Sequence, residues 1–289
     1  MDASFVLIQA LNGVQYGILL FLVASGLTLV FGIMGVINLA HGSFYMIGAY
    51  LAYWLTAKTG SLGGAVALGI PIAFALGLAV ERFAVSFLYG QDHLKQVLLT
   101  YGLILVLNEL QRMLWGSDVH SVPVPEILRG TVRLTETLSY PIYRLFLSAA
   151  CLALAGGMAW VVRRTRLGMT IRAAAADRET AGALGIDTDR LFSLVFGAGA
   201  VLAALAGMLA APIESVAPGM GEQVLVLCLV IVVIGGIGSV KGAFLGAMAI
   251  GLADSFGKTL LPETAGLFVY GLMAAALVWR PQGLFARGT

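Results

Sequence analysis

The chain has 289 residues, of which 60% are hydrophobic and 11% are charged, and its formal net charge is +2. An average soluble domain carries roughly 25% charged residues, so a soluble globular fold of this size is excluded. The apolar runs are long and do not alternate, which indicates membrane-spanning helices rather than a β-barrel. The sequence therefore predicts an all-α polytopic membrane protein that forms a single transmembrane domain over residues 1–289.

Nine apolar segments follow one another along the chain. They cover about residues 5–34, 36–57, 63–80, 97–114, 142–162, 191–211, 224–237, 242–256 and 266–279. No basic residue precedes the first segment, so we expect it to remain in the mature protein instead of being cleaved as a signal peptide. The seventh and ninth segments are short for a membrane core of roughly 30 Å. The expected number of transmembrane helices is therefore eight or nine.

Two junctions between these segments are rich in helix breakers. Gly32, Gly35, Gly42 and Gly48 crowd the junction of the first two segments, which favours a broken helix. The joint over residues 212–222 contains two prolines and two glycines, so it either lies outside the membrane or partly re-enters it.

The most strongly charged stretch lies between residues 163 and 190, and we call it the charged segment. It contains six of the 17 Lys and Arg residues and four of the 15 Asp and Glu residues of the chain. Apolar runs flank it on both sides, so it has to lie in water. The excess of arginine indicates a cytoplasmic loop.

The distribution of basic residues predicts the orientation. With the N-terminus outside, the inner loops contain eleven Lys and Arg residues and the outer loops contain six. Because cytoplasmic loops carry the excess of positive charge, we expect the N-terminus outside and the C-terminus in the cytoplasm. The less hydrophobic stretch over residues 115–140 is then an external loop, either a partner surface or simply solvated.

Two catalytic interpretations fail on spacing and context. Residues 251–259 resemble a phosphate-binding loop, but the position that requires glycine is Leu252, and the stretch ends an apolar helix. His41 and Ser43 lie two residues apart and would point to different sides of a helix. We expect no catalytic residue, no metal and no cofactor in this chain.

Polar residues inside the apolar runs are costly in lipid, so we expect them to face the bundle interior, a cavity or a partner. They are Asn12, Gln15, Asn38, His41, Ser43, Asn108, Glu109, Gln111 and Asp254. For most of them, hydrogen bonding between helices is the simpler interpretation. Asn38, His41 and Ser43 cluster with Gly35 and Gly42, and this group is expected either to lie near the translocation path or to cap a broken helix.

Small residues spaced four apart predict close helix contacts. They form three stripes, which are Gly13-Gly17, Gly199-Ala203-Gly207 and Gly242-Gly246.

Within the charged segment, residues 172–184 predict one helix, because Ala, Arg and Glu favour helices and only Gly182 opposes one. Gly185 suits the position that ends it. A helix of about 13 residues spans roughly 20 Å, and this one is too short and too charged to cross a membrane. It is either a solvated connector or, as its Ala-rich face favours, an element that docks into a groove of another protein.

Several stretches resemble known transporters. IRAAAADRETAGALGID resembles the coupling loop of ABC importer permeases, although the consensus Glu-Ala-Ala is here Arg172-Ala173-Ala174. GLTLVFGIMGVINLAHGSFYMIGAY (26–50), VIGGIGSVKGAFLGA (233–247) and RPQGLF (280–285) resemble the high-affinity branched-chain amino acid permease family. Within that family the chain is most similar to the H-type subunit, in the right order over nearly the whole length.

The resemblance implies a multi-pass permease subunit of an ATP-driven importer in the bacterial inner membrane. Its implied partners are membrane lipid, a second permease chain of the M-type, two cytoplasmic ATPase subunits that bind ATP and Mg²⁺, and a periplasmic substrate-binding protein, but no nucleic acid. The implied coupling contacts are Arg172, Ala173, Ala174, Asp177, Arg178, Glu179, Gly182, Leu184 and Gly185. Family members also carry urea and short amides, so the substrate stays open between these and branched-chain amino acids.

An ion-coupled secondary amino-acid carrier is the alternative from another class. Such a carrier should show paired ionisable groups inside the membrane. Glu109, Asp254 and His41 are the candidates, and none has an identifiable basic partner in a neighbouring apolar run. The sequence therefore favours the ATP-driven importer.

Overall fold

The computed structural model describes residues 3–133, 138–236 and 238–280. Its elements are α1 (Ala3–Met34), α2 (His41–Thr59), α3 (Leu62–Phe83), η1 (Val85–Leu88), α4 (His93–Trp115), η2 (Glu126–Leu128), β1 (Thr131–Arg133), β2 (Ser139–Pro141), α5 (Ile142–Arg164), α6 (Arg166–Ala176), α7 (Arg178–Ala183), α8 (Thr188–Ala210), α9 (Met220–Gly235), α10 (Val240–Leu260), η3 (Pro262–Thr264) and α11 (Ala265–Trp279). The predicted all-α fold holds, apart from a short antiparallel hairpin in which Val132 pairs with Tyr140.

Five of the described helices are long and apolar enough to cross a membrane, namely α1, α3, α4, α5 and α8. α9 and α11 are apolar but shorter. α2 and α10 have 19 and 21 residues and are not among these five. The chain is therefore a multi-pass membrane protein, and the number of eight or nine spans stays a prediction.

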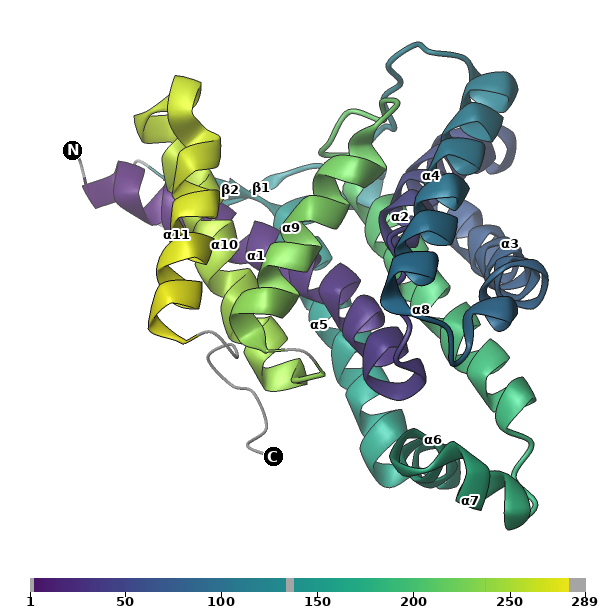
Figure 1. The fold of residues 1–289 in the computed structure, drawn as a ribbon. Coiled ribbons are helices and arrows are strands. Elements are labelled where there is room, and N and C mark those ends of the chain that lie inside the picture. The colour runs from purple at the N-terminus through teal and green to yellow at the C-terminus, as the bar shows by residue number, and fades with distance from the viewer. Residues whose placement is uncertain (1–2, 134–137, 237, 281–289) are drawn as a thin grey trace.

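α1, α2 and α8 form the interior of the bundle. α1 packs along α10 and α8 and also contacts α5 and α9, while α2 packs against α8, α3 and α9 (Figure 1). Phe44, Tyr45 and Tyr50 of α2 are at most 1% exposed. α3, α4 and α5 leave most of their apolar surface uncovered by the rest of the chain, so these helices face lipid or another chain.

The three predicted stripes of small residues all lie at helix crossings, which confirms that prediction. A Cβ added to Gly17 in α1 would lie 2.9 Å from Met248 in α10. One added to Gly207 in α8 would lie 2.9 Å from the carbonyl carbon of Tyr45 in α2, and one on Gly246 would lie 2.9 Å from the carbonyl oxygen of Ile231. The helices can approach this closely only because no Cβ stands between them.

The connections between helices gather at two opposite ends of the bundle. At the end that holds the start of α1, the backbones of His120 and Val216 exchange two hydrogen bonds of 2.9 Å, and the Ser255 hydroxyl donates to the Gln9 carbonyl at 3.0 Å. The other end carries α6 and α7, which lie beside the C-terminal turns of α1 (Figure 1). We call these the N-terminal end and the α6–α7 end.

The junction of α1 and α2 is broken, as predicted. Gly35 adopts a left-handed backbone with φ of 64°, which ends α1, and α2 begins only at His41. Between them the chain runs along α4, where the Ile37 amide donates to the Gln96 side-chain oxygen at 3.1 Å. The backbone groups that the break frees are thus partly satisfied by a neighbouring helix.

The joint between α8 and α9 is shorter than predicted, because α9 starts at Met220 rather than near residue 224. Gly219 precedes the helix with φ of 82°, a conformation that glycine adopts without strain. Val216 is fully buried in this joint, where its backbone pairs with that of His120. The joint therefore packs against the loop that follows α4.

Candidate functional site

The charged segment forms two helices, so the prediction of one helix over residues 172–184 is wrong. Asp177 separates α6 from α7 with an extended backbone (φ −154°, ψ 106°), and its carboxylate accepts a hydrogen bond from the Thr180 amide at 3.0 Å. Aspartate favours such a capping position over a helix interior, which explains the break. Hydrogen bonds from the Thr180 hydroxyl and then its amide lower the pKa of Asp177, so the cap is ionised at neutral pH. Gly185 ends α7 with φ of 88°, as predicted.

One side of α6 and α7 is anchored to the bundle. Ile171 and Ala174 of α6 and Ala181 of α7 are at most 5% exposed, and they form a small apolar cluster with the start of α8. Leu29 and Ile33 of α1 pack against this cluster. A movement of α6 and α7 would therefore reach α1 and α8 directly.

Arg178 holds α7 in place through three contacts. Its guanidinium lies 4.8 Å from the ring centroid of Tyr89 and 4.9 Å from that of Phe192, and it pairs with Asp189 at 2.7 Å. Tyr89 lies in the connection between α3 and α4, while Phe192 and Asp189 belong to the first turn of α8. Arg178 therefore joins α7 to two other parts of the bundle.

Glu81 extends this contact deeper into the bundle. Its side chain is 2% exposed and accepts hydrogen bonds from the hydroxyl groups of Tyr89 and Ser193. Burial, followed by the hydrogen bond to Glu81, raises the pKa of Tyr89, so its hydroxyl remains a donor at neutral pH. The end of α3 is thereby linked to α7 and α8 at one place.

We expect replacement of Arg178 by alanine to loosen α7 without unfolding the bundle. Each contact with an aromatic ring is worth roughly 0.5–1 kcal/mol, and the partly exposed ion pair contributes little more. The combined loss of about 1–2 kcal/mol should raise amide hydrogen exchange in α7 roughly 5–30-fold. The matched control is Arg190→Ala, because the Arg190 side chain is 87% exposed and its one ion pair among the described residues is with nearby Asp187. Equal exchange in both variants would contradict this role of Arg178.

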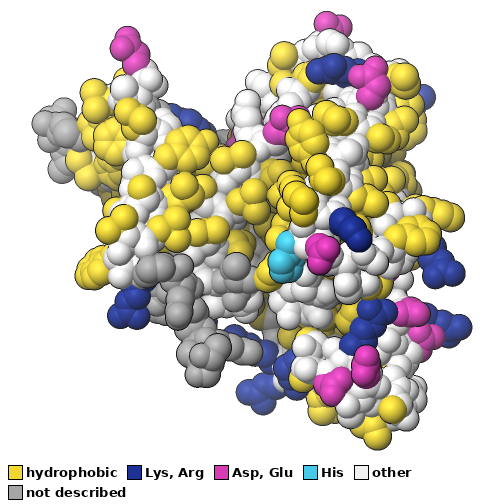
Figure 2. Space-filling view, in the orientation of Figure 1, with side chains coloured by type: hydrophobic (Ala, Val, Ile, Leu, Met, Phe, Trp, Pro, Cys, Tyr) yellow, Lys and Arg dark blue, Asp and Glu magenta, His cyan; other side chains and the backbone are white. Residues whose placement is uncertain are grey.

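The opposite side of α6 and α7 is exposed. Leu184 is 78% exposed and Met169 is 55% exposed, so two large apolar side chains lie among the charged ones on this side. Glu179 and Gly182 are also exposed, whereas Arg172 donates a hydrogen bond to the Val162 carbonyl at the end of α5. Figure 2 shows acidic, basic and apolar side chains intermixed over this end of the molecule.

The five residues predicted to lie near a translocation path are at the start of α2 or just before it. Asn38, His41 and Ser43 are at most 3% exposed, and His41 Nε2 lies 3.0 Å from the Val23 carbonyl oxygen of α1. Gly42 packs against Gly221 at the start of α9. Gly35, Asn38, His41, Gly42 and Ser43 do not line the two polar cavities described next. Their contacts fit a packing role, and their place in transport stays a prediction.

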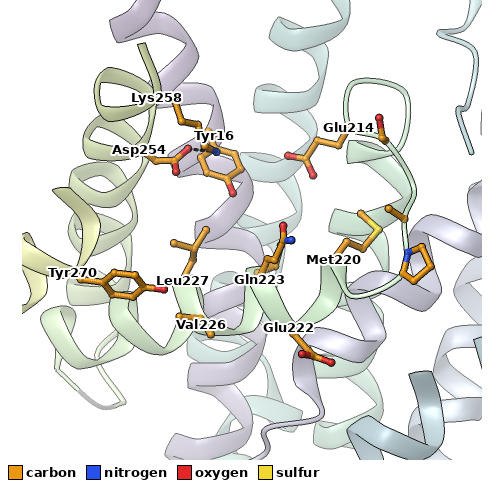
Figure 3. Close-up of a pocket in the computed structure, with 14 residues that line it drawn as sticks. Tyr16, Glu214, Met220, Glu222, Gln223, Val226, Leu227, Asp254, Lys258 and Tyr270 are labelled. Atoms are coloured by element: carbon orange, nitrogen blue, oxygen red, sulfur yellow. Dashed lines mark ion pairs between the residues drawn. The ribbon is translucent and has the colours of Figure 1, made fainter. Parts of the chain in front are cut away.

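Two adjoining polar cavities open at the N-terminal end. The larger, of about 670 Å³, lies between α1, α9, α10, α11 and the joint that precedes α9 (Figure 3). The smaller, of about 270 Å³, lies between α1, α5 and α10. Tyr16, Glu214, Asp254 and Lys258 line both cavities, so the two adjoin each other at these residues.

The sequence identified part of the lining of these cavities. Asn12, Gln15 and Asp254 were expected to face the interior or a cavity, and they line these cavities. Tyr16 and Glu214 were missed, because a tyrosine in an apolar run and a glutamate in a proline-rich joint carry no signal of their own. The spacing of Asn12, Gln15 and Tyr16, which share one side of α1, was the available signal.

Comparison with known proteins identifies the family. The model of the family described as branched-chain amino acid transport system / permease component matches residues 9–277. The chain belongs to this family. The permease protein BraD of Pseudomonas aeruginosa is 30% identical over 296 residues, which cover 96% of this chain and 95% of BraD. The permease protein LivH of Escherichia coli K12 is 31% identical over 305 residues, with 96% of this chain and 95% of LivH covered.

The second type of branched-chain amino acid permease also matches, but less completely. LivM of Escherichia coli K12 is 29% identical over 293 residues, which cover 90% of this chain and only 66% of LivM. The match over nearly the full length of LivH and BraD confirms the predicted resemblance to the H-type subunit. No solved structure matches the chain.

Proposed function

We propose that this branched-chain amino acid permease is one of two membrane subunits of an ATP-driven ABC importer in the bacterial inner membrane. A second permease chain of the M-type would complete the translocation path. Two cytoplasmic ATPase subunits would bind ATP and Mg²⁺, and a periplasmic binding protein would deliver the substrate. The family membership and the similarity to both LivH and LivM support this arrangement.

The observation that carries the proposal is that α6 and α7 have one buried side and one exposed side. One side is buried against α1 and α8, and the other presents Leu184, Met169 and Glu179 to solvent. An anchored pair of short helices with an exposed apolar tip suits docking into a groove of another protein. The coupling contacts are proposed to come from Arg172, Ala173, Ala174, Asp177, Arg178, Glu179, Gly182, Leu184 and Gly185.

The orientation follows from the same proposal. If the ATPases dock on α6 and α7, the α6–α7 end is cytoplasmic, and the N-terminal end with its two cavities faces the periplasm. The arginine-rich charged segment favours the same orientation. Closure of the ATPase dimer would then move α6 and α7, and the bundle would switch between outward-facing and inward-facing states. Gly35, Asn38, His41, Gly42 and Ser43 are proposed to lie close to the path that opens and closes.

Substitution of Leu184 by aspartate tests the docking surface. We expect ATP-dependent uptake of leucine into proteoliposomes to fall roughly tenfold or more, because a charge would replace an apolar anchor at the centre of the interface. Leu184→Met should retain most of the uptake. Since Leu184 is 78% exposed, both variants should insert and melt like the parent protein. Full uptake by the aspartate variant would contradict docking through α7.

The remaining alternatives concern the substrate and the energy source. An importer of urea or short amides would have the same architecture, and competition of leucine uptake by these compounds separates the cases. An ion-coupled secondary carrier would take up substrate without ATPase subunits. Asp254 pairs with Lys258 of the same helix at 2.7 Å, and Glu109 pairs with Arg112 of the same helix at 3.8 Å. Within the described part of the chain, neither carboxylate forms an ion pair with another helix.

A further inference from the structure

Glu214 and Arg144 line these adjoining cavities, and neither forms an ion pair with a residue that the structure describes. Glu214 accepts a hydrogen bond from the Tyr45 hydroxyl at 2.7 Å, but it forms no ion pair with any described residue. Arg144 lines the smaller cavity together with Glu214, and its described partners are the neutral side-chain oxygens of Asn12 at 3.0 Å and Gln15 at 3.2 Å. A carboxylate and a guanidinium thus line one cavity without forming an ion pair with each other.

Gln15 gives a second indication that this cavity binds a polar group. Its side chain is 4% exposed and lines the smaller cavity, and its Nε2 has no hydrogen-bond partner among the described residues. A buried donor without a partner costs free energy unless a ligand or water accepts from it. The donors of Gln15 and Arg144 together suit a carboxylate.

The larger cavity offers a different surface. Figure 3 shows the carboxylate of Glu214 pointing from the joint before α9 toward Tyr16 on α1. Met220, Val224 and Leu227 of α9 line the same cavity and supply apolar side chains. A volume of about 670 Å³ is ample for a small molecule.

The cavity wall already holds one ammonium group. Lys258 Nζ lies 2.7 Å from Asp254 and 5.4 Å from the ring centroid of Tyr16. A carboxylate next to an aromatic face is therefore an arrangement that stabilises an ammonium at this place. Glu214 lies on the other side of Tyr16 and offers the same chemistry to a ligand.

We propose that these cavities bind an α-amino acid in its zwitterionic form, with its ammonium on Glu214, its carboxylate on Arg144 and Gln15, and its apolar side chain against α9. Tyr45 holds Glu214 in position from α2. The proposal rests on the proposed function, because it takes the N-terminal end as the periplasmic mouth of the path. It excludes urea and neutral amides as good ligands, since these leave both charged groups without a partner.

Binding of tritiated leucine to membranes that contain the transporter without its binding protein and without ATP tests the site directly. The competitors are leucine, 4-methylpentanoate, which lacks the ammonium, leucinamide, which lacks the carboxylate, and urea. For the parent protein we expect both analogues to compete roughly 10–100-fold more weakly than leucine. We expect no competition by urea at the same concentrations.

Two substitutions test which residue binds the ammonium and which binds the carboxylate of leucine. Glu214→Gln should weaken leucine binding and remove the difference between leucine and 4-methylpentanoate, and Arg144→Met should remove the difference between leucine and leucinamide. Glu263→Gln and Arg133→Met are the matched controls, because they make the same changes at exposed positions that line neither cavity. Unchanged discrimination in the Glu214 and Arg144 variants, with leucine binding retained, would overturn the proposal.

The test separates this proposal from the proposed function. If both analogues bind the parent protein as well as leucine does, the proposed binding site is wrong. The proposed importer function is then still tested separately by ATP-dependent uptake. If leucine binding depends on Glu214 and Arg144 but uptake needs no ATP, the site stands and the importer fails. Elution profiles and melting temperatures of the variants identify any that fold poorly. For these, the gentler changes Glu214→Asp and Arg144→Lys should give intermediate discrimination.

Discussion

Replacing the buried Gly48 by alanine should destabilise the bundle, whereas the same change at a glycine with open space around it should not. The new Cβ would lie 2.6 Å from both the Cα and the carbonyl carbon of Ala204, and closer still to its carbonyl oxygen. α2 and α8 would have to separate, since these contacts are with backbone atoms that cannot turn away. Overpacking of this kind costs about 1–3 kcal/mol and sometimes more.

The measurement is thermal unfolding of the purified protein in detergent, with Gly102→Ala as the matched control. Gly102 lies inside α4, and a Cβ there would meet no atom within 4 Å. The control should be neutral or slightly stabilising, because alanine favours helices over glycine by about 1 kcal/mol. We expect a melting temperature several degrees lower for the Gly48 variant alone. Equal melting of both variants would show that α2 and α8 do not cross as described.

Exchanging residues 172–184 for a flexible Gly/Ser linker of equal length should reduce ATP-dependent uptake to background. The linker removes the end of α6, all of α7 and the contacts of Arg178, so no rigid element remains for the ATPases to move. The chain should still insert, because this segment lies outside the helices that are apolar enough to span the membrane. Uptake at the parent level would exclude coupling through this segment.

A more selective variant keeps the buried side of the segment. Ala174 and Ala181 belong to the cluster beneath α6 and α7, so the full linker also strips part of that packing. Serine substitutions limited to the exposed residues Arg172, Glu179 and Leu184 leave the cluster and Arg178 in place. If the docking surface alone couples ATP hydrolysis to transport, this variant should lose most uptake while its α7 keeps normal hydrogen exchange.

The fold was predictable where local chemistry decides it. Long apolar runs predicted the helices, and small residues four apart predicted where helices cross. Gly35 and Gly185 predicted two helix ends. Each of these features depends on a few neighbouring residues. The single helix over residues 172–184 was wrong because two local preferences competed there. Helix propensity favours one continuous helix, but an aspartate stabilises a helix more as its N-terminal cap than from its interior, and Asp177 caps α7.

The site was predictable only in part, because it is assembled from distant segments. Gln15 and Asp254 drew attention as polar groups in apolar runs, yet nothing local indicates that they share a cavity wall with Glu214. His41 drew the same attention and lies instead against the backbone of Val23. Which polar residue faces a cavity and which satisfies a neighbouring helix depends on the packing of the whole bundle.

α1 touches both functional regions with one uninterrupted helix of 32 residues. Gln15 and Tyr16 line the cavities, while Leu29 and Ile33 rest on the cluster beneath α6 and α7. These contacts lie about 21 Å apart along the axis, at 1.5 Å per residue. Because α1 is one continuous helix, a movement at one of these contacts can reach the other through the helix itself. A small tilt or rotation of α1 imposed at the end near α6 and α7 would therefore change the shape of the cavities at the same time.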